Sequence, residues 1–371
     1  MLPLFVFGTL RHRPLLEAVV GDLSHLALSS AALPGHAVSG VDGGDFPTIV
    51  AQTGATADGS LITGLTAQDV ARLAFYEGAF GYDLRSVTLA DGTLAQAYFP
   101  ANTQPPGTDL WSLEAWVQDW AQISVLSARE VMSYLGQKTP QELVDMFPMI
   151  RARAWSRINA ATSKHGARTL EGTVDIKNQR RAYAKYFALD EIELRHAQFD
   201  GSKSETVARA VFLAADATLV LPYDPVRDQV LLVEQVRMGP LARGDTVLWQ
   251  LEPIAGRLDP GEGPQDAARR EALEEAGLEI GVLHPVAEAY CSPGNSSEFY
   301  YIYVGIADLP PGTGRIGGLA SEHEDIRSHV LCFDELMRMC ADLQVANAPL
   351  VMAAYWLAHH RAGLRAAAGS H

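Results

Sequence analysis

The 371-residue sequence contains only 3 cysteines, Cys291, Cys332 and Cys340, and no two of them have the C-x-x-C spacing. A disulfide framework and a thiolate zinc site are therefore excluded, and a reducing, cytoplasmic location is expected. The sequence also lacks a run of about 18 uninterrupted apolar residues, so no membrane span is expected. The N-terminus has no basic segment before its apolar stretch and no small-residue cleavage site, which predicts a first β-strand rather than a signal peptide.

Basic residues are scarce. The chain has 29 Lys and Arg against 44 Asp and Glu, which gives a net charge of −15, and the deficit is spread over both halves. Tight binding to a phosphate backbone requires clustered cations, so nucleic acid is not expected as a partner. If the substrate nonetheless contains phosphate, a few arginines or a divalent metal must offset its charge locally.

The length predicts two domains, since single domains average roughly 150 residues. Short apolar runs bounded by glycine and turn residues predict a mainly β domain in the first 100 residues. From 110 to 135 the apolar residues, including three tryptophans, recur at helical spacing, which predicts a core-facing helix. We place this domain at 1–135, a linker at 136–168 and a second domain at 169–365. Strand-like runs around one helix and a final helix near 349–361 predict an α/β/α sandwich with a mixed sheet for the second domain.

The most informative stretch is GRLDPGEGPQDAARREALEEAGL, residues 256–278. Pro264 suits the first turn of a helix and Gly277 suits its C-terminal cap, so the pattern predicts a glycine-rich loop followed by a helix of about 13 residues. Glu271 and Glu275 are four residues apart and share one face, with Glu274 close by. Like charges at this spacing destabilise a helix unless a positive charge lies between them. A bound divalent cation, Mg²⁺ or alternatively Mn²⁺, would supply that charge, whereas the simpler interpretation is an acidic helix facing solvent.

The complete spacing G-x5-E-x7-R-E-x2-E-E-x-G favours the metal site. Seven specified positions match it: Gly256, Glu262, Arg270, Glu271, Glu274, Glu275 and Gly277. This is the Nudix box, and the segment resembles the Nudix hydrolase superfamily, whose members cleave a nucleoside diphosphate linked to another moiety. The resemblance implies a metal-dependent phosphate-handling site.

Further motifs resemble bacterial ADP-ribose pyrophosphatases over roughly residues 170–360. They are LPYDPVRD at 221–228, VEQVR at 233–237, SPG at 292–294 with Glu298, GLA at 318–320 and EHEDI at 322–326. Pro293, about fifteen residues beyond the box, stands where this branch differs from other Nudix branches. The resemblance implies hydrolysis of ADP-ribose to AMP and ribose 5-phosphate. The alternatives are a different nucleoside diphosphate sugar, such as ADP-glucose or GDP-mannose, and a non-catalytic sensor, against which the intact box carboxylates weigh.

The resemblance also implies roles for single residues. Metal ligands would be the Ala255 carbonyl and the side chains of Glu271, Glu274, Glu275 and Glu324. Glu322 would be the general base and Arg237 would bind the pyrophosphate, with Arg209 and Glu252 touching substrate and Glu262 and Arg270 orienting the ligands. Without the resemblance, Glu322 and Glu324 would be taken for an exposed acidic loop and Arg237 for a surface ion-pair partner. The family works as homodimers that exchange the strands matching 173–201.

The first domain carries FVFGTLR at 5–11, FYEG at 75–78 and YDLR at 82–85. These motifs resemble the gamma-glutamyl cyclotransferase family, which implies a small β-barrel that holds substrate against a loop, here Phe7, Gly8, Thr9 and Leu10, with Glu77 moving the proton. Phe7 stands where the family has Tyr and Ala74 where an acidic residue is common, so turnover by this domain stays open. The two-domain combination resembles bacterial proteins linked to tellurite resistance, a phenotype that gives no mechanism. His323, His359 and His360 are expected to be surface residues and Cys291 a packing residue.

Overall fold

The computed structural model describes residues 2–41, 44–101, 106–163, 166–309, 316–318 and 324–369. The chain divides into two compact units. Unit 1 comprises Met1–Ser163 with Ala184–Tyr186, and unit 2 comprises Lys164–Tyr183 with Phe187–His371. Among the described residues, no helix is long and apolar enough to cross a membrane.

Unit 1 is built on a six-stranded sheet with the order β4-β5-β1-β3-β2-β6. Its strands are β1 (Leu4–Val6), β2 (Ala27–Val41), β3 (Pro47–Thr63), β4 (Tyr82–Thr88), β5 (Leu94–Pro100) and β6 (Pro106–Leu110). The short first strand lies between β3, to which it is antiparallel, and β5, to which it is parallel. The expected β-barrel is not closed, because the edge strands β4 and β6 each pair with a single neighbour in the described part of the unit.

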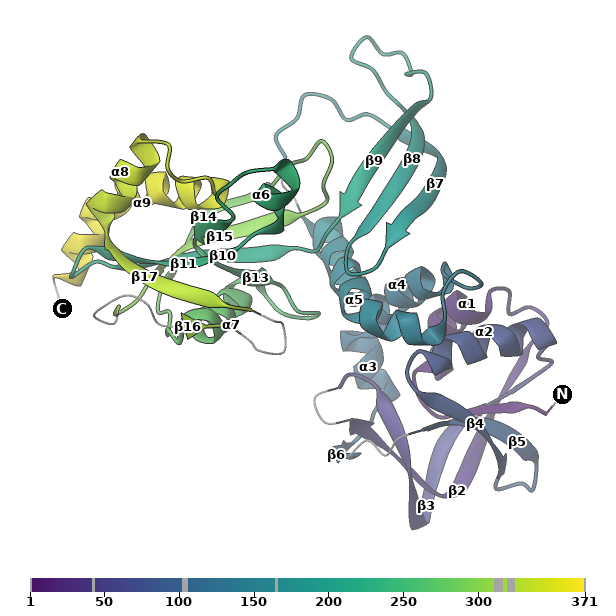
Figure 1. The fold of residues 1–371 in the computed structure, drawn as a ribbon. Helices are drawn as coiled ribbons and strands as arrows, with labels where there is room; N and C mark the ends of the chain where they lie inside the picture. Colours follow the sequence, from purple (N-terminus) through teal and green to yellow (C-terminus); the bar gives the residue numbers. More distant parts are fainter. Residues whose placement is uncertain are drawn as a thin grey trace. The chain divides into compact units, whose positions relative to one another are not determined.

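In the described part of unit 1, five α-helices and one short 3₁₀ turn accompany this sheet (Figure 1). They are η1 (Thr9–Arg11), α1 (Arg13–Val20), α2 (Ala67–Gly78), α3 (Leu113–Asp119), α4 (Ala121–Met132) and α5 (Pro140–Thr162). The single helix expected over 110–135 is two helices that meet at Trp120, which is the C-cap of α3 and has non-helical backbone angles. The structure also differs from the expected linker at 136–168. There Thr139 and Glu142 form a capping box that starts the 23-residue α5, and Leu143, Met146 and Ile150 anchor this helix in the core of unit 1.

Unit 2 contains a mixed eight-stranded sheet, in which β14-β15-β10-β11-β17-β16 form the main path, β12 pairs with β11 and β13 pairs with β10. The strands are β10 (Ala217–Asp224), β11 (Gln229–Val236), β12 (Trp249–Glu252), β13 (Ile254–Arg257), β14 (Leu283–Tyr290), β15 (Phe299–Ile306), β16 (Ile316–Gly317) and β17 (Ile326–Cys332). β10 and β15 are parallel, whereas β10 is antiparallel to β11 and β13. The predicted mixed sheet is thus confirmed.

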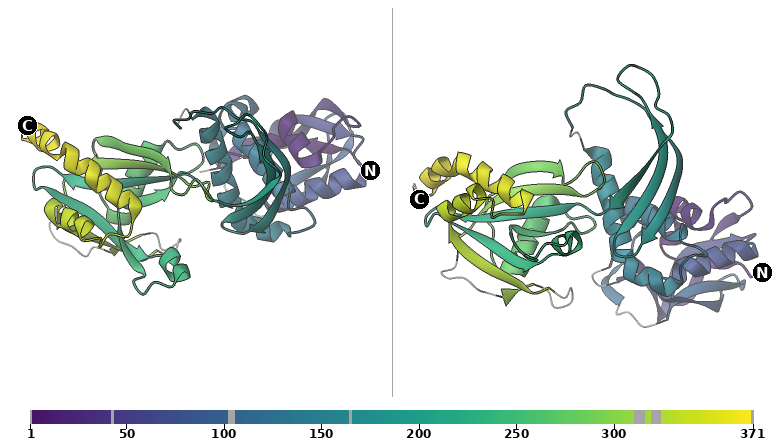
Figure 2. Two further views of the ribbon diagram at one scale, coloured as in Figure 1. Left: turned by 90° about the horizontal axis from the view of Figure 1, so that it is seen from above. Right: turned by 45° about the horizontal axis from the view of Figure 1, so that its top comes forward.

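Helices cover both faces of this sheet (Figure 2). α7 (Pro264–Ala276) packs on one face through Ala268 and Ala272, which join a cluster with Val220 on β10. α8 (Phe333–Ala341) and α9 (Ala348–Ala368) pack on the other face, in a cluster that contains the neighbouring Leu219 and Leu221. Because successive strand residues point to opposite faces, β10 contributes to both cores, as the α/β/α prediction requires. α6 (Met238–Arg243) follows β11.

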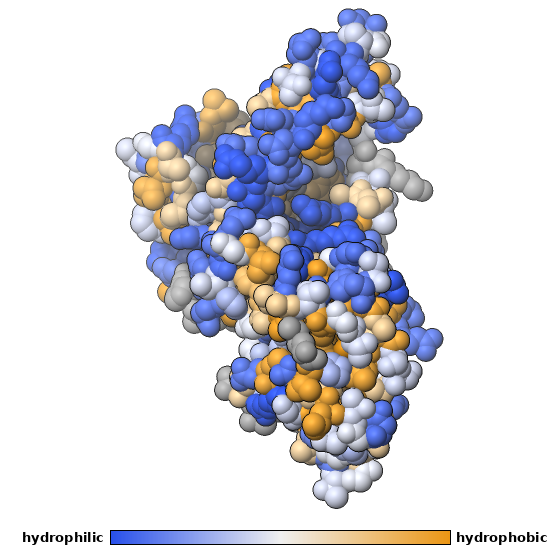
Figure 3. Space-filling model, turned by 90° about the vertical axis from the view of Figure 1, so that its right-hand side faces the viewer, coloured by the Kyte–Doolittle hydropathy of each residue, from blue (hydrophilic) through white to orange (hydrophobic). Residues whose placement is uncertain are grey.

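A separate three-stranded sheet of β7 (Val174–Ala184), β8 (Ala188–His196) and β9 (Val207–Leu213) precedes the large one in the sequence. Ala184 is the one residue of its strands that belongs to a described hydrophobic cluster. Several large apolar side chains of β7 are exposed instead: Val174 by 61%, Ile176 by 55% and Tyr183 by 52%. Hydrophilic residues predominate over this sheet, at the top of Figure 3, with hydrophobic patches among them.

Candidate active site

The loop and helix predicted from residues 256–278 form as expected. α7 spans Pro264–Ala276, with Pro264 in its first turn, and ends at Gly277, whose φ of 61° lies in the left-handed region that glycine adopts without strain. Gly256 on β13 lies directly against the helix. A β-carbon at this position would lie 1.8 Å from Oε1 of Glu271, so the approach of strand and carboxylate requires glycine.

Arg270 organises the acidic cluster. Its guanidinium donates to both carboxylate oxygens of Glu262 at 3.0 Å, to Oε1 of Glu271 at 2.8 Å and to Oε2 of Glu274 at 3.0 Å. It also donates to the carbonyl of Arg257 at 3.0 Å, which ties the helix to the end of β13. One arginine therefore holds three glutamates in fixed directions, and these ion pairs raise its own pKa.

Glu275 is the most buried carboxyl of this cluster, at 2% exposure. Burial raises its pKa to about 9, and repulsion from Glu271 and Glu324 acts in the same direction. Burial raises the pKa of Glu271 to about 7 against the opposing attraction of Arg270. The amide of Ala255 donates to Glu275 at 3.4 Å, so the backbone at Ala255 also lies beside this carboxylate.

This arrangement fits a divalent cation. The raised pKa values of Glu271 and Glu275 indicate that too little positive charge lies near them to stabilise their ionised forms. A bound Mg²⁺ would supply that charge, and Mg²⁺ prefers oxygen ligands. Within the described residues, no three Asp, Glu, His or Cys side chains are already gathered into a ligand set. Glu322, the expected general base, and His323 lie outside the described residues, whereas Glu324 is described and its charge acts on both Glu271 and Glu275.

Arg237 and Glu252 form a second charged group on the strands that lead into the cluster. The arginine follows β11 and donates hydrogen bonds to both carboxylate oxygens of Glu252 on β12, with nitrogen–oxygen distances of 2.6 to 3.0 Å. Burial opposes the charged form of Arg237, but the pair with Glu252 raises its pKa overall, and the charge of Glu275 contributes. The structure therefore brings these two expected substrate-binding residues together near the acidic cluster.

The other two expected substrate-binding residues lie elsewhere. Arg209 is exposed on β9, where it donates to the carbonyl of Ala208, and Pro293 lies in the exposed turn after β14. Neither has a hydrogen bond or ion pair with the acidic cluster in the described part of the chain. Near that turn, Cys291 is exposed rather than the expected packing residue. Its thiol donates to Glu298 at 3.2 Å, and partial desolvation together with the charge of Glu298 raises its pKa. His360 stacks on Trp356 with ring centroids 3.9 Å apart.

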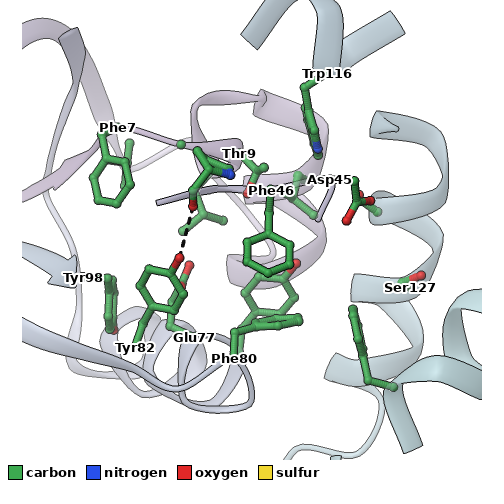
Figure 4. Close-up of a pocket in the computed structure, with 18 of the residues that line it drawn as sticks. Phe7, Thr9, Asp45, Phe46, Glu77, Phe80, Tyr82, Tyr98, Trp116 and Ser127 are labelled. Carbon is green, nitrogen blue, oxygen red and sulfur yellow. Dashed lines mark hydrogen bonds between the residues drawn. The ribbon is translucent and has the colours of Figure 1, made fainter. Parts of the chain in front are cut away.

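Unit 1 contains a cavity of its own (Figure 4). Its empty space, which includes open solvent at the mouth, is about 820 Å³. Phe7, Gly8, Thr9 and Leu10 line it, as the sequence predicts for a substrate loop. The loop is tightly fitted, because a β-carbon on Gly8 would lie 2.7 Å from Cγ of Pro47.

Glu77, at the end of α2, also lines this cavity. Burial raises the pKa of its carboxyl to about 8. No hydrogen bond to this carboxyl forms within the described residues, and no described cation contributes to its pKa. The side chain is therefore largely protonated at neutral pH and can donate or accept one proton at its terminal oxygens.

The cavity wall also includes residues that were not predicted from the sequence, among them Asp45, Ser127, Phe147 and Arg151. Phe147 and Arg151 lie on α5, in the segment expected to be a linker, and Ser127 lies on α4. Arg151 donates to both oxygens of Asp45, at 2.8 and 2.5 Å. No local sequence motif marks these residues, because their proximity depends on how α4 and α5 pack.

Comparison with known proteins assigns the two units to different families. A family model described as NUDIX domain matches residues 214–353, and one described as gamma-glutamyl cyclotransferase, AIG2-like, matches residues 4–118. The ADP-ribose pyrophosphatase of Escherichia coli (strain K12) is 40% identical over 192 residues, which cover 52% of this chain and 91% of that protein. The ADP-ribose pyrophosphatase of Haemophilus influenzae is 34% identical over 186 residues, or 50% of this chain and 85% of that protein. The GDP-mannose pyrophosphatase of Yersinia pestis (strain Pestoides F) is 30% identical over 153 residues, or 41% and 76%.

Proposed function

We propose that unit 2 hydrolyses ADP-ribose to AMP and ribose 5-phosphate, because this chain belongs to the Nudix family. Its N-terminal part is a gamma-glutamyl cyclotransferase-like domain. The observation that carries the proposal is the 40% identity to an ADP-ribose pyrophosphatase over 91% of that enzyme's length. The acidic cluster on α7 supports it, since its carboxylates are positioned by Arg270 and need a cation. The GDP-mannose pyrophosphatase relative, at 30% identity, supports the alternative substrate less strongly.

The chain's residues have the following roles in this proposal. Glu271, Glu274, Glu275, Glu324 and the Ala255 carbonyl would hold Mg²⁺, or Mn²⁺ in its place, which would supply positive charge to offset the pyrophosphate and to lower the pKa of water. Glu262 and Arg270 fix the directions of the ligands.

Arg237 binds the pyrophosphate, and Arg209, Glu252 and Pro293 contribute to substrate recognition. Arg237 is half-exposed and already oriented by Glu252, so its guanidinium can turn part of its donor fork to phosphate oxygens. Glu322 takes the proton from water as the water oxygen bonds to phosphorus and the bond from that phosphorus to the bridging oxygen breaks. Arg209 is exposed and donates to the neighbouring Ala208 carbonyl, so its guanidinium is accessible to a substrate.

The assembly proposed for unit 2 is a homodimer formed through the segment 173–201. Its three-stranded sheet exposes Val174, Ile176 and Tyr183, which a second copy of the chain would cover. The sedimentation velocity of the full chain tests this proposal, and a monomer at micromolar concentration would contradict it. The cytoplasmic location stays a prediction, supported by the three unpaired cysteines, and the link to tellurite resistance stays untested.

For unit 1 we propose that the cavity is a second active site, in which Glu77 moves a proton while the loop from Phe7 to Leu10 holds the substrate. The raised pKa of Glu77 supports proton transfer near neutral pH. Phe7 lacks the hydroxyl of the tyrosine usual in the cyclotransferase family, so turnover by this unit needs its own test, namely pyroglutamate release from γ-glutamyl amines by the parent and by Glu77→Gln.

The first experiment measures nucleotide release by the purified full chain from ADP-ribose, ADP-glucose, NADH and GDP-mannose in Mg²⁺ buffer. We expect preferential release of AMP from ADP-ribose and its loss in Glu322→Gln. Preferential release of GMP from GDP-mannose would establish the alternative substrate. Binding of ADP-ribose without turnover would instead indicate a sensor.

A further inference from the structure

The chain between β2 and β3 forms part of the wall of the cavity in unit 1. Asp45, Phe46 and Pro47, which end the turn and begin β3, line this cavity. Asp45 and Phe46 are partly exposed, whereas Pro47 is buried. In the described part of the hairpin, the ladder between the two strands ends at the pair of Gly40 and Pro47. The positions of Asp45 and Phe46 therefore depend largely on contacts outside the sheet.

One side chain of α5 holds this turn. Arg151 donates to both carboxylate oxygens of Asp45, at 2.8 and 2.5 Å, and the two side chains are only 17% and 12% exposed. The guanidinium also lies over the rings of Trp120 and Phe147, at 5.7 and 6.0 Å from their centroids. The preceding residue, Ile150, is fully buried in the core of unit 1. Because its helix is anchored and its planar fork makes two contacts at once, Arg151 fixes Asp45 relative to that core.

Pro47, two residues beyond Asp45, sets the position of the loop from Phe7 to Leu10. Its ring is so close to Gly8 that a β-carbon on the glycine would lie 2.7 Å from Cγ of the proline. Packed protein interiors leave few voids, so a shift of the proline either pushes this loop or leaves a gap beside it. The position of Gly8 in the cavity wall thus depends on the position of Pro47.

Pro47 also holds a side chain near Glu77. The carbonyl of Pro47 accepts a hydrogen bond from the Tyr82 hydroxyl at 3.1 Å. Burial raises the pKa of Tyr82 to about 12, and the charge of Glu77 acts in the same direction, so the phenol lies near this carboxyl. Figure 4 shows Tyr82 beside Glu77 in the cavity. One proline therefore connects the loop at Gly8 to the residue next to the carboxyl.

We propose that Arg151 is a positioning residue of the unit 1 site: through Asp45 it fixes Pro47, and Pro47 sets both the loop at Gly8 and the ring of Tyr82 relative to Glu77. Arg151 needs no contact with a substrate for this role. It lies outside the segment 4–118 that matches the cyclotransferase model, so α5 is a working part of the site although no motif marks it. The kinetic consequences rest on the activity proposed for unit 1, whereas the positioning itself is tested without a substrate.

Hydrogen–deuterium exchange of the full chain, followed by mass spectrometry, provides that substrate-free test. We expect Arg151→Gln to speed exchange severalfold in peptides covering 44–50 and 7–12, the second of which contains the amides of Arg11 and His12 that bond to Gly8 and Thr9. Exchange in α4 and in β10 should stay at the parental rate. Arg157→Gln is the matched control, because Arg157 is exposed on the same helix and lies outside the cavity wall.

Two exchange results would overturn the proposal. Parental exchange at 7–12 in Arg151→Gln would show that the turn does not transmit the position of Arg151 to the loop. Faster exchange throughout α4 and α5 would show that the arginine only stabilises the helices. If Arg151→Gln does not fold, Arg151→Lys, which keeps the charge but loses the planar fork, is measured in its place with the same expectation.

Pyroglutamate release from γ-glutamyl amines provides a kinetic test. Arg151→Gln should lower kcat/KM by roughly tenfold or more, because misplaced groups lose catalytic geometry. Tyr82→Phe removes only the hydroxyl that bonds to Pro47. If both residues act through Pro47, the double variant should lose little more than the weaker of the two single variants, whereas independent roles would multiply the two losses and overturn the proposal. A parent chain that releases no pyroglutamate would refute the activity proposed for unit 1, and the exchange experiment would still decide the role of Arg151.

Discussion

Gly256 and Glu271 approach so closely that a β-carbon on residue 256 would lie 1.8 Å from Oε1 of Glu271. The carboxylate therefore occupies the space in which every other residue would carry its side chain. Because Gly256 is part of β13, the sheet fixes where this carboxylate lies. Gly256 on β13 and Glu271 on α7 are therefore sterically coupled, although they lie fifteen positions apart and in different elements.

The first prediction follows from this contact. Gly256→Ala should displace the Glu271 carboxylate and reduce AMP release from ADP-ribose by about a hundredfold, since a shift of about 1 Å in catalytic geometry has an effect of that order. Gly263→Ala is the matched control in the same loop, because the nearest atom to its new β-carbon would be Oδ2 of Asp266 at 3.4 Å. Steady-state kinetics of both variants measure the difference, and near-parental turnover by Gly256→Ala would contradict the placement of Glu271 in the catalytic centre.

The second prediction concerns the proton acceptor. Glu322→Gln keeps the size of the side chain but cannot accept the proton from water, so kcat should fall by about 10² to 10⁴ while substrate affinity changes little. Glu279→Gln, at an exposed position just beyond α7, is the control and should retain parental kcat. Equal turnover in the two variants would show that another residue is the base.

The third prediction concerns Arg237, which uses a two-pronged contact to hold Glu252. Arg237→Lys retains the charge but loses the planar fork, so kcat/KM for ADP-ribose should fall by roughly tenfold or more, chiefly through a higher KM. Arg243→Lys, on an exposed arginine of α6 that pairs with Asp245, should leave the kinetics unchanged. A parental KM in Arg237→Lys would remove this residue from substrate binding.

Much of unit 2 can be predicted from the sequence, because its signals are local. The start and the end of α7 are set by residues at those positions, Pro264 and Gly277. The shared face of Glu271 and Glu275 follows from their spacing of four residues. The alternation of Leu219, Val220 and Leu221 between two cores likewise follows from strand periodicity.

The cavity of unit 1 was only half predictable. The loop at Gly8 and the glutamate at position 77 are carried by short motifs, whereas Arg151 reaches Asp45 across 106 residues of sequence. The apolar pattern of 140–162 is weak because Pro148 and several charged residues interrupt it, and only tertiary packing shows that Leu143 and Ile150 are fully buried. A prediction from local periodicity therefore takes this helix for a linker.

The fourth prediction concerns the metal. Since burial and mutual repulsion disfavour the charged forms of Glu271 and Glu275, Mg²⁺ should raise the melting temperature of the full chain by binding the folded state, and EDTA should abolish AMP release. The Mg²⁺-dependent shift should disappear in Glu275→Gln and persist in Glu279→Gln. An identical shift in Glu275→Gln would place the stabilising ion elsewhere.

The last prediction uses the buried carboxyl of Glu77, whose pKa is raised from 4.5 to about 8 by burial. Between these two values the folded chain keeps a proton that the unfolded chain has lost, so the free energy of unfolding decreases as the pH rises. The stabilisation from protonated Glu77 is complete below about pH 4.5 and is lost as the pH rises to about 8.

Glu77→Gln is neutral throughout this range and should escape that loss. Its stability relative to the parent should therefore increase on the order of 2 kcal/mol between about pH 5 and pH 8, less than the full pKa shift implies because the cavity admits water. Thermal denaturation at several pH values measures this difference, with the exposed Glu17→Gln as control. A difference that stays constant with pH would mean that Glu77 is ionised in the folded chain, and the proton transfer proposed for it near neutral pH would then have to be abandoned.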